Sequence, residues 1–250
     1  MNPIPEILFE DEDIIVISKP PRLNVHGNGR DEEYTLTDWL LEHDPSLVDV
    51  GEPLKLEGGK TIPKPGLAHR LDRDTSGVMV IARNQRAYKK LKNQFQEREV
   101  EKWYHAIVYG AVKGRYGEID QPIGRSSVNF KRRTTNPETM RGRMRPAYSE
   151  YWVALSAPKA SLLKVRPKTG RTHQVRVHCA AIKHPIVCDH LYASHRERLL
   201  GFSRSALHAY QITFTHPTSG ERVVFTAPYP QDFENAVEAL KKEAQTDTST

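Results

Sequence analysis

The chain has 250 residues, of which 38% are hydrophobic, and its mean hydropathy is −0.62. This is enough apolar material for a core, and no run approaches the ~18 apolar residues that a membrane-spanning helix needs. The 37 lysines and arginines exceed the 31 acidic residues, and the net charge of +6 is compatible with an anionic partner. Two cysteines and an amino terminus without a signal-peptide pattern argue against a disulfide framework and secretion, so we expect a cytoplasmic protein.

Two short strands are predicted near the amino terminus, at 7–9 and 14–17, and the acidic turn between them indicates a hairpin. Proline cannot donate a hydrogen bond to a neighbouring strand, so the two prolines after Lys19 end the second strand. Lys19 has two interpretations of equal weight: it borders a binding cleft, or it is a solvated lysine before a turn.

A short helix is predicted over 38–43, with Thr35 or Thr37 as its capping residue. Proline, glycine and lysine then recur without a regular period over 45–65, which indicates a long surface loop. This loop leads into the most distinctive stretch of the chain.

That stretch is His69-Arg70-Leu71-Asp72-Arg73-Asp74-Thr75-Ser76-Gly77, followed at once by the apolar run Val78-Met79-Val80-Ile81-Ala82. The run predicts a buried strand, so the charged segment before it is a polar loop at the edge of the core. Reactive groups are commonly presented on such loops. Taken alone, Asp72 and its neighbours are also typical of a surface turn whose arginines pair with its acids.

A helix over about 85–98 and a strand over 101–110 follow. Asn84 can cap the helix, whose apolar residues recur every four positions on one face. The strand is rich in β-forming residues and carries Tyr104 near its start. A strand tyrosine by itself more often belongs to a core than to an active site.

The segment 125–145 contains seven basic residues and one acidic residue. Its apolar residues are too sparse for a packed element, so we predict a flexible basic loop that contacts RNA phosphates through Lys131, Arg132 and Arg133. The alternative is a solvated linker without a binding role.

Strands are predicted over 147–155 and 162–166, followed by a helix that Thr172 caps. His173 and His178 do not form a zinc site, because their spacing places them on different helix faces and no glutamate follows His173.

The chain ends with a strand over 208–214, a hairpin and a helix near 232–243. The polar residues 244–250 are expected to form a disordered tail. We therefore expect a single domain over 1–243.

Three motifs together resemble one known family. His69-Arg70-Leu71-Asp72 with Thr75-Ser76-Gly77 is similar to the signature of the RluA-type RNA pseudouridine synthases, which isomerise uridine within RNA. A tyrosine at the start of a strand, here Tyr104, and the stretch Gly170-Arg171-Thr172-His173-Gln174-Val175-Arg176-Val177-His178 are similar to two further landmarks of that family. The resemblance extends over residues 7–228.

The resemblance implies a catalytic set. Asp72 is the catalytic carboxylate, and Arg176 is the guanidinium that keeps it ionised. Tyr104 packs against the target base and can also assist the removal of a proton. Covalent attack by Asp72 and proton abstraction from the ribose both remain open.

The resemblance also implies a substrate-binding set. Arg70 enters the RNA helix where the flipped uridine has left, because an enzyme acting on a stacked base must extrude it. Leu71 forms a wall of the same pocket, and Arg171 and Lys19 are further candidates for contact with the RNA.

The implied fold is α+β: a pseudouridine synthase fold with a long, mixed, mainly antiparallel sheet flanked by helices and a central catalytic cleft. Its partner is ribosomal or transfer RNA, and it needs no metal or other cofactor and acts as a monomer. Some relatives carry a small RNA-binding domain ahead of the catalytic one, and here we expect none. One departure is Val187-Cys188-Asp189, where a glycine often precedes the aspartate; we interpret it as a detail of a turn.

Three other functions compete with this one. A glycoside hydrolase that uses Asp72 and Asp74 as its pair of carboxylates is a weaker alternative. A serine hydrolase built on Ser76 lacks the G-x-S-x-G elbow. A non-catalytic RNA-binding protein remains the alternative, although binding alone needs no carboxylate among phosphates.

Overall fold

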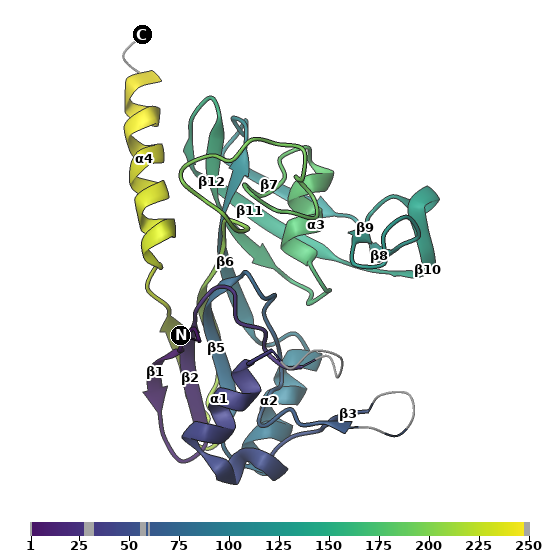
Figure 1. Ribbon diagram of the computed structural model, residues 1–250, viewed down its shortest axis with the longest axis vertical. Coiled ribbons are helices and arrows are strands. Elements are labelled where there is room, and N and C mark those ends of the chain that lie inside the picture. Colours follow the sequence, from purple (N-terminus) through teal and green to yellow (C-terminus); the bar gives the residue numbers. More distant parts are fainter. Residues whose placement is uncertain (1, 28–32, 56–58, 60, 248–250) are drawn as a thin grey trace. The chain divides into compact units, whose positions relative to one another are not determined.

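The computed structural model describes residues 2–27, 33–55, 59 and 61–247. The chain divides into two compact units (Figure 1): unit 1 comprises residues 1–101 and 209–228, and unit 2 comprises residues 102–208 and 229–250. Strands and helices are combined in both, so the predicted α+β class is confirmed. Among the described helices, none is both long and apolar enough to cross a membrane. The expected single domain over 1–243 stays a prediction.

Unit 1 is built on a sheet in which β5 (Ser76–Ala82) is wholly buried. The strand order is β1-β2-β5-β13, and β14 pairs with β13. Branched apolar side chains of β2 and β5 pack with Ala87 and Leu91 of the following helix, which provides the core. The predicted hairpin and the predicted strand end at Lys19 are confirmed. The strands are β1 (Glu6–Glu10), β2 (Ile14–Lys19), β5 (Ser76–Ala82), β13 (Leu207–Thr215, in unit 1 from Ala209) and β14 (Arg222–Thr226).

The helices of unit 1 begin at the capping residues that the sequence indicates. Thr35 precedes the first helix, and its N–H donates to Asp38 Oδ2 at 2.8 Å. Asn84 Oδ1 accepts from the Ala87 N–H at 2.9 Å. The segment 45–65, expected to be loop, contains a 3₁₀ turn and two paired short strands among its described residues. The elements are α1 (Leu36–His43), η1 (Pro45–Asp49), β3 (Leu54–Lys55), β4 (Thr61–Ile62) and α2 (Gln85–Gln96).

Unit 2 is built on four antiparallel strands in the order β6-β12-β11-β7. Two helices, α3 and α4, pack on these strands, and their apolar side chains complete the core. The last helix continues through 244–247, so the predicted disordered tail is wrong for those four residues; 248–250 lie outside the described residues. The elements are β6 (Glu101–Tyr109), β7 (Tyr116–Asp120), β11 (Tyr148–Ser156), β12 (Ala160–Pro167), α3 (Gln174–Ala181) and α4 (Gln231–Asp247).

The basic segment of unit 2 is a three-stranded sheet, and the prediction of a flexible loop is wrong. The strands, in the order β10-β8-β9, are β8 (Ile123–Ser126), β9 (Arg133–Thr134) and β10 (Met140–Arg145), with the 3₁₀ turn η2 (Pro137–Thr139) before β10. Gly124 makes room for the methionines of β10, since a Cβ at Gly124 would lie 2.5 Å from Met140 Cγ. Backbone pairing orders this segment, and Ile123 of β8 packs in a small apolar cluster with Ala147 and Val177.

The cap of α3 also differs from the prediction. His173, not Thr172, is the residue before the helix, and it has a left-handed backbone with φ of +58° and ψ of +20°. The Gln174 side chain accepts from the Arg171 N–H at 3.0 Å and from the Thr169 hydroxyl at 2.7 Å. A buried amide therefore fixes the entry to this helix.

Candidate functional sites

Asp72 lies in a tight turn immediately before the buried strand β5. The Thr75 N–H donates to the Asp72 carbonyl at 3.1 Å, which closes the turn. Asp72 is half-buried, its neighbour Leu71 is only 4% exposed, and Arg70 is exposed. The prediction of a charged loop at the edge of a core strand is confirmed.

Lys19 and His69 hold this turn in place. The Lys19 side chain is completely buried, and its Nζ donates to the carbonyls of Pro20 at 2.7 Å, Leu23 at 3.0 Å and Arg73 at 3.1 Å. His69 Nε2 accepts from the Val80 N–H at 3.1 Å. The interpretation of Lys19 as a solvated lysine is therefore wrong. These hydrogen bonds tie the turn to the end of β2, which is a positioning role.

The two arginines that flank Asp72 both reach the segment between β2 and α1. Arg70 Nη1 donates to His26 Nε2 at 2.8 Å, and Arg73 Nη2 lies 2.7 Å from Glu33 Oε1. Burial, and then the neighbouring positive charges, lower the pKa of His26, so that its ring is neutral and can accept from Arg70. Arg70 is thereby held at the surface in a defined orientation.

In unit 2, Arg176 forms a buried two-point ion pair. Its Nε donates to Asp189 Oδ2 at 2.6 Å and its Nη2 to Asp189 Oδ1 at 2.8 Å, and its guanidinium lies 5.3 Å from the centre of the Tyr192 ring. Burial opposes the negative charge of Asp189, but the hydrogen bonds and charge of Arg176 outweigh it, so the pKa of Asp189 lies below its usual value. Both groups are charged at neutral pH.

Asp189 is a residue of this arrangement whose role the sequence did not reveal. Its Oδ1 also accepts from the N–H groups of Leu191 at 3.0 Å and Tyr192 at 3.2 Å. The preceding Cys188 has φ of +56°, the left-handed region that favours glycine. Cys188, which stands where a glycine is common, therefore has a backbone that glycine adopts easily. This non-glycine residue before Asp189 was the signal in the sequence that could have drawn attention to Asp189.

Tyr104 lies on β6, opposite Val165 of β12, and is half-buried against the core of unit 2. Tyr104 and Arg176 thus belong to unit 2, whereas Asp72 belongs to unit 1. The roles of these three residues, and the pairing of Asp72 with Arg176, stay predictions.

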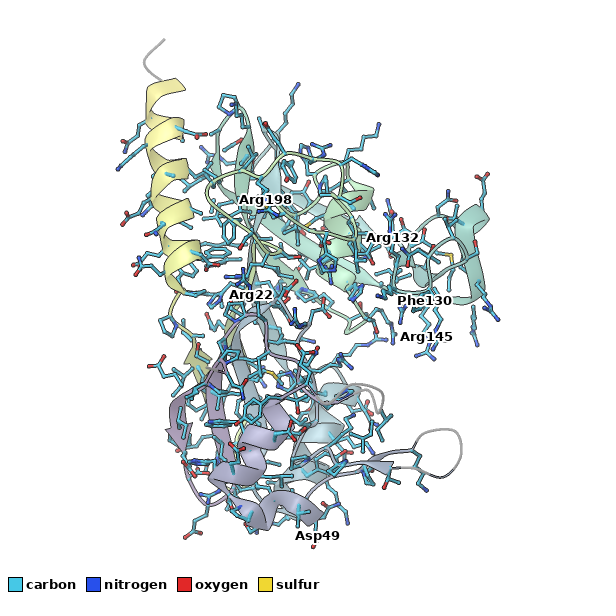
Figure 2. The ribbon with its side chains drawn as sticks, in the orientation of Figure 1. Arg22, Asp49, Phe130, Arg132, Arg145 and Arg198 are labelled. Carbon is cyan, nitrogen blue, oxygen red and sulfur yellow. The ribbon has the colours of Figure 1, made fainter. Side chains whose placement is uncertain are left out.

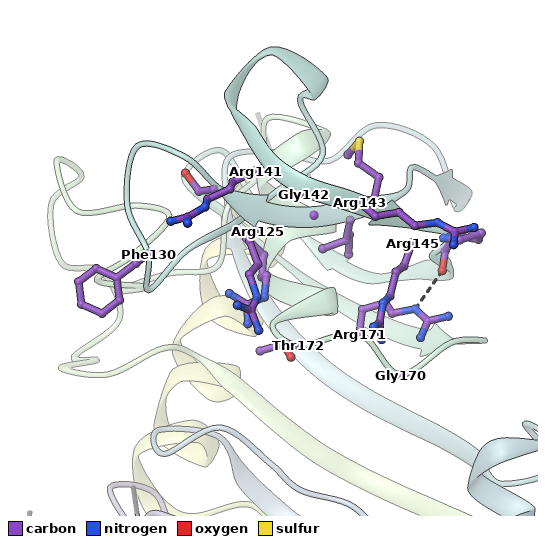
Figure 3. A pocket seen from close by; sticks show the side chains of 15 residues that line it. Arg125, Phe130, Arg141, Gly142, Arg143, Arg145, Gly170, Arg171 and Thr172 are labelled. Carbon is purple, nitrogen blue, oxygen red and sulfur yellow. Dashed lines mark hydrogen bonds between the residues drawn. The ribbon is translucent and has the colours of Figure 1, made fainter. Parts of the chain in front are cut away.

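A groove of about 890 Å³ lies in unit 2 between the basic sheet and the start of α3. Figure 3 shows the side chains that line it, and Figure 2 shows Phe130, Arg132 and Arg145 around the same small sheet. None of the fifteen lining residues is acidic. Six are arginines: Arg125, Arg133, Arg141, Arg143, Arg145 and Arg171. Such a concentration of guanidinium groups is suited to a chain of phosphates.

The predicted RNA contacts divide between this groove and its surroundings. Arg133 and Arg171 line it, and Arg171 Nε donates to the Pro146 carbonyl at 3.1 Å. Arg132 lies 5.2 Å from the centre of the Tyr192 ring, and Lys131 lies 5.8 Å from that of Phe130. The other lining arginines come mainly from β10. The sequence signal for these arginines was the number of basic residues in 125–145. The prediction singled out only three residues of that segment, Lys131, Arg132 and Arg133.

Comparisons with known proteins agree on one family. The model for RNA pseudouridylate synthase matches residues 13–181. An Aquifex aeolicus protein named uncharacterized RNA pseudouridine synthase is 41% identical over 244 residues, which cover 94% of this chain and 73% of that protein. Ribosomal large subunit pseudouridine synthase D of Vibrio parahaemolyticus is 36% identical over 251 residues, which cover 96% of this chain and 72% of that protein.

Two solved human structures have similar folds. Human RNA Pseudouridylate Synthase Domain Containing 1 has a TM-score of 0.72 at 25% identity, covering 96% of this chain and 95% of its own. Human RNA Pseudouridylate Synthase Domain Containing 4 has a TM-score of 0.71 at 26% identity, and the match covers 94% of this chain and 92% of the human chain.

Proposed function

The chain belongs to the RNA pseudouridylate synthase family, whose members isomerise uridine in RNA, and we propose that it modifies specific uridines of ribosomal RNA with Asp72 as its nucleophile. The name of a relative supports this substrate, because the Vibrio parahaemolyticus protein is called ribosomal large subunit pseudouridine synthase D. Transfer RNA is the second candidate substrate. We further propose that the protein acts as a monomer in the cytoplasm.

The observation that carries the proposal is the fixed position of Asp72 before the buried strand β5. The reaction breaks the bond between uracil N1 and ribose C1′ and forms one between C5 and C1′; C5 loses a proton and N1 gains one. An ionised carboxylate can begin it by attacking C1′ or by removing a ribose proton. A turn held by Lys19 and His69 keeps such a carboxylate in place.

The other residues take supporting roles in this proposal. Arg176, whose orientation is set by Asp189, supplies the positive charge that favours the ionised form of Asp72. Tyr104 stacks on the extruded uracil, and Leu71 forms a wall of its pocket. Arg70 takes the place of the flipped base in the RNA helix.

The arginine groove binds the RNA backbone in this proposal. Six guanidinium groups in a groove with no acidic lining residue attract phosphates regardless of sequence and so orient the RNA without selecting the uridine.

The test is tritium release from RNA labelled at uridine C5, offered separately as unmodified ribosomal and transfer RNA transcripts. Wild type should release tritium from ribosomal RNA, and Asp72→Ala should release none while binding the RNA as tightly. Asp74→Ala, which removes a carboxylate two residues away, is the matched control and should remain active.

Each alternative has its own outcome. Release from transfer RNA alone would change the substrate, and activity of Asp72→Ala would contradict the nucleophile. Tight binding of both RNAs by wild type with no release from either would favour a non-catalytic RNA-binding protein.

A further inference from the structure

The turn between β8 and β9 exposes two large apolar side chains. Val128 and Phe130 are each 80% exposed, whereas Phe202, Phe214 and Phe233 are at most 2% exposed. An exposed phenylalanine contributes almost nothing to the fold, because the favourable free energy of an apolar ring comes from its removal from water. Phe130 is therefore available to a partner.

Hydrogen bonds define the backbone of this turn. Ser126 Oγ accepts from the N–H groups of Val128 at 3.2 Å and Asn129 at 3.3 Å, and Asn129 Oδ1 accepts from the Lys131 N–H at 2.9 Å. The Arg132 N–H donates to the Asn129 carbonyl at 2.9 Å. A ring on a preformed turn loses little conformational entropy when it binds.

The base of the turn is anchored to another part of unit 2. The Arg133 N–H donates to the Tyr192 hydroxyl at 2.8 Å, and the Arg132 guanidinium lies over the same ring. Tyr192 in turn follows Asp189, the partner of Arg176. The exposed ring is thus held in a defined position within the unit that carries Arg176.

Phe130 also lines the arginine groove. Figure 3 shows its ring at one end of the groove, beyond Arg125 and Arg141. An RNA strand whose phosphates bind the guanidinium groups would bring a nucleobase to this end of the groove. Every RNA base has a face that stacks on an aromatic ring, and unpaired bases are free to do so. The absence of acidic residues among the lining residues favours a polyanion over a protein as the occupant.

We propose that Phe130 stacks on an unpaired base of the substrate RNA and fixes the register of the strand that crosses the arginine groove. This inference rests on the proposed function and adds to it a binding residue and a substrate feature, a base that is unpaired next to the phosphates in the groove. The arginines attract the RNA, and Phe130 holds it at one position.

The test compares Phe130→Ala, Phe130→Tyr and Phe130→Leu in titrations of an unmodified ribosomal RNA transcript at several salt concentrations. Phe130→Ala should raise Kd about 5- to 150-fold, the range for loss of one base–aromatic stack. Phe130→Tyr should stay within about 3-fold of wild type, and Phe130→Leu should resemble Phe130→Ala. The slope of log K against log salt should not change, because no charge is removed. Ile4→Ala, at a 72% exposed residue, is the matched control and should have no effect.

Phe130→Trp gives a second readout, the tryptophan fluorescence of the protein. Wild type already contains three tryptophans, and RNA should quench more fluorescence in Phe130→Trp than in wild type. A wild-type Kd in Phe130→Ala, or no additional quenching in Phe130→Trp, would overturn the proposal, and full rescue by Phe130→Leu would replace stacking by a simple apolar contact. Failure of the proposed function can be distinguished from failure of this inference. In the first case wild type itself would release no tritium or bind no RNA.

Discussion

The Arg176 guanidinium is tied to the Asp189 carboxylate by two hydrogen bonds of 2.6 and 2.8 Å, with both side chains at most 5% exposed. A buried ion pair of this kind fixes an orientation, whereas removing one member leaves an uncompensated charge. The pair therefore determines how Arg176 is presented to its surroundings.

Asp189→Asn should lower the free energy of unfolding by about 3–5 kcal/mol, because the Arg176 charge stays buried without its counter-charge. Urea denaturation measures this loss. Combining it with Arg176→Met should cost less than the sum of the two single changes, since the double variant buries no unpaired charge. Additive losses would show that the two side chains are energetically independent.

Lys19→Met should lower stability by about 2–4 kcal/mol, because three carbonyls lose the ammonium that they share. It should also lower kcat with little change in the Kd for RNA, since the substitution displaces the turn that carries Asp72 and leaves the arginine groove intact. Lys55→Met, at an exposed lysine of the same unit, is the control. A weaker Kd with an unchanged kcat would instead indicate direct substrate contact by Lys19.

The double substitution Arg141→Ala and Arg143→Ala should weaken RNA binding and reduce the slope of log K against log salt by about 1.5, as expected for two lost phosphate contacts. Lys113→Ala with Arg115→Ala removes two exposed charges of the same unit outside the groove and is the matched control. Equal slopes in both double variants would mean that net charge, and not the groove, governs binding.

Local signals explain which elements could be predicted from the sequence. The apolar run of β5 and the cap at Asn84 depend on neighbouring residues, and both are found as predicted. By contrast, β10 has exposed arginines and half-buried methionines instead of an apolar face, and its order comes from pairing with β8. Hydrophobic periodicity cannot detect such a strand.

The candidate site shows the same limit. Asp72 and Arg176 lie in motifs that can be recognised in the chain, but Asp189 is thirteen residues from Arg176, and tertiary structure alone brings them together. The buried ammonium of Lys19 is a further case, since a lysine is exposed in most proteins unless it is paired. The sequence motifs therefore indicate the candidate reactive groups more readily than the groups that hold them in place.

His105 is a buried residue of β6, and its Nδ1 is hydrogen-bonded to the Tyr229 hydroxyl. Burial, followed by the charges of His208 and Lys164, lowers the pKa of His105 to about 4. Because the folded-state pKa lies below the ordinary value of about 6.5, the unfolded chain binds more protons between these values. The stabilisation from neutral His105 is therefore complete above pH 6.5 and declines as the pH falls toward 4.

The expected loss of unfolding free energy across this window is about 3 kcal/mol from His105 alone. His105→Gln keeps a polar partner for Tyr229 and removes the titration, so its free energy of unfolding should fall less steeply than that of wild type between pH 6.5 and 4. Urea denaturation at intervals of half a pH unit measures both curves. His195→Gln, at an exposed histidine, should follow wild type. If the His105→Gln and wild-type curves ran parallel through the window, protonation of His105 would not contribute to the acid sensitivity of the fold.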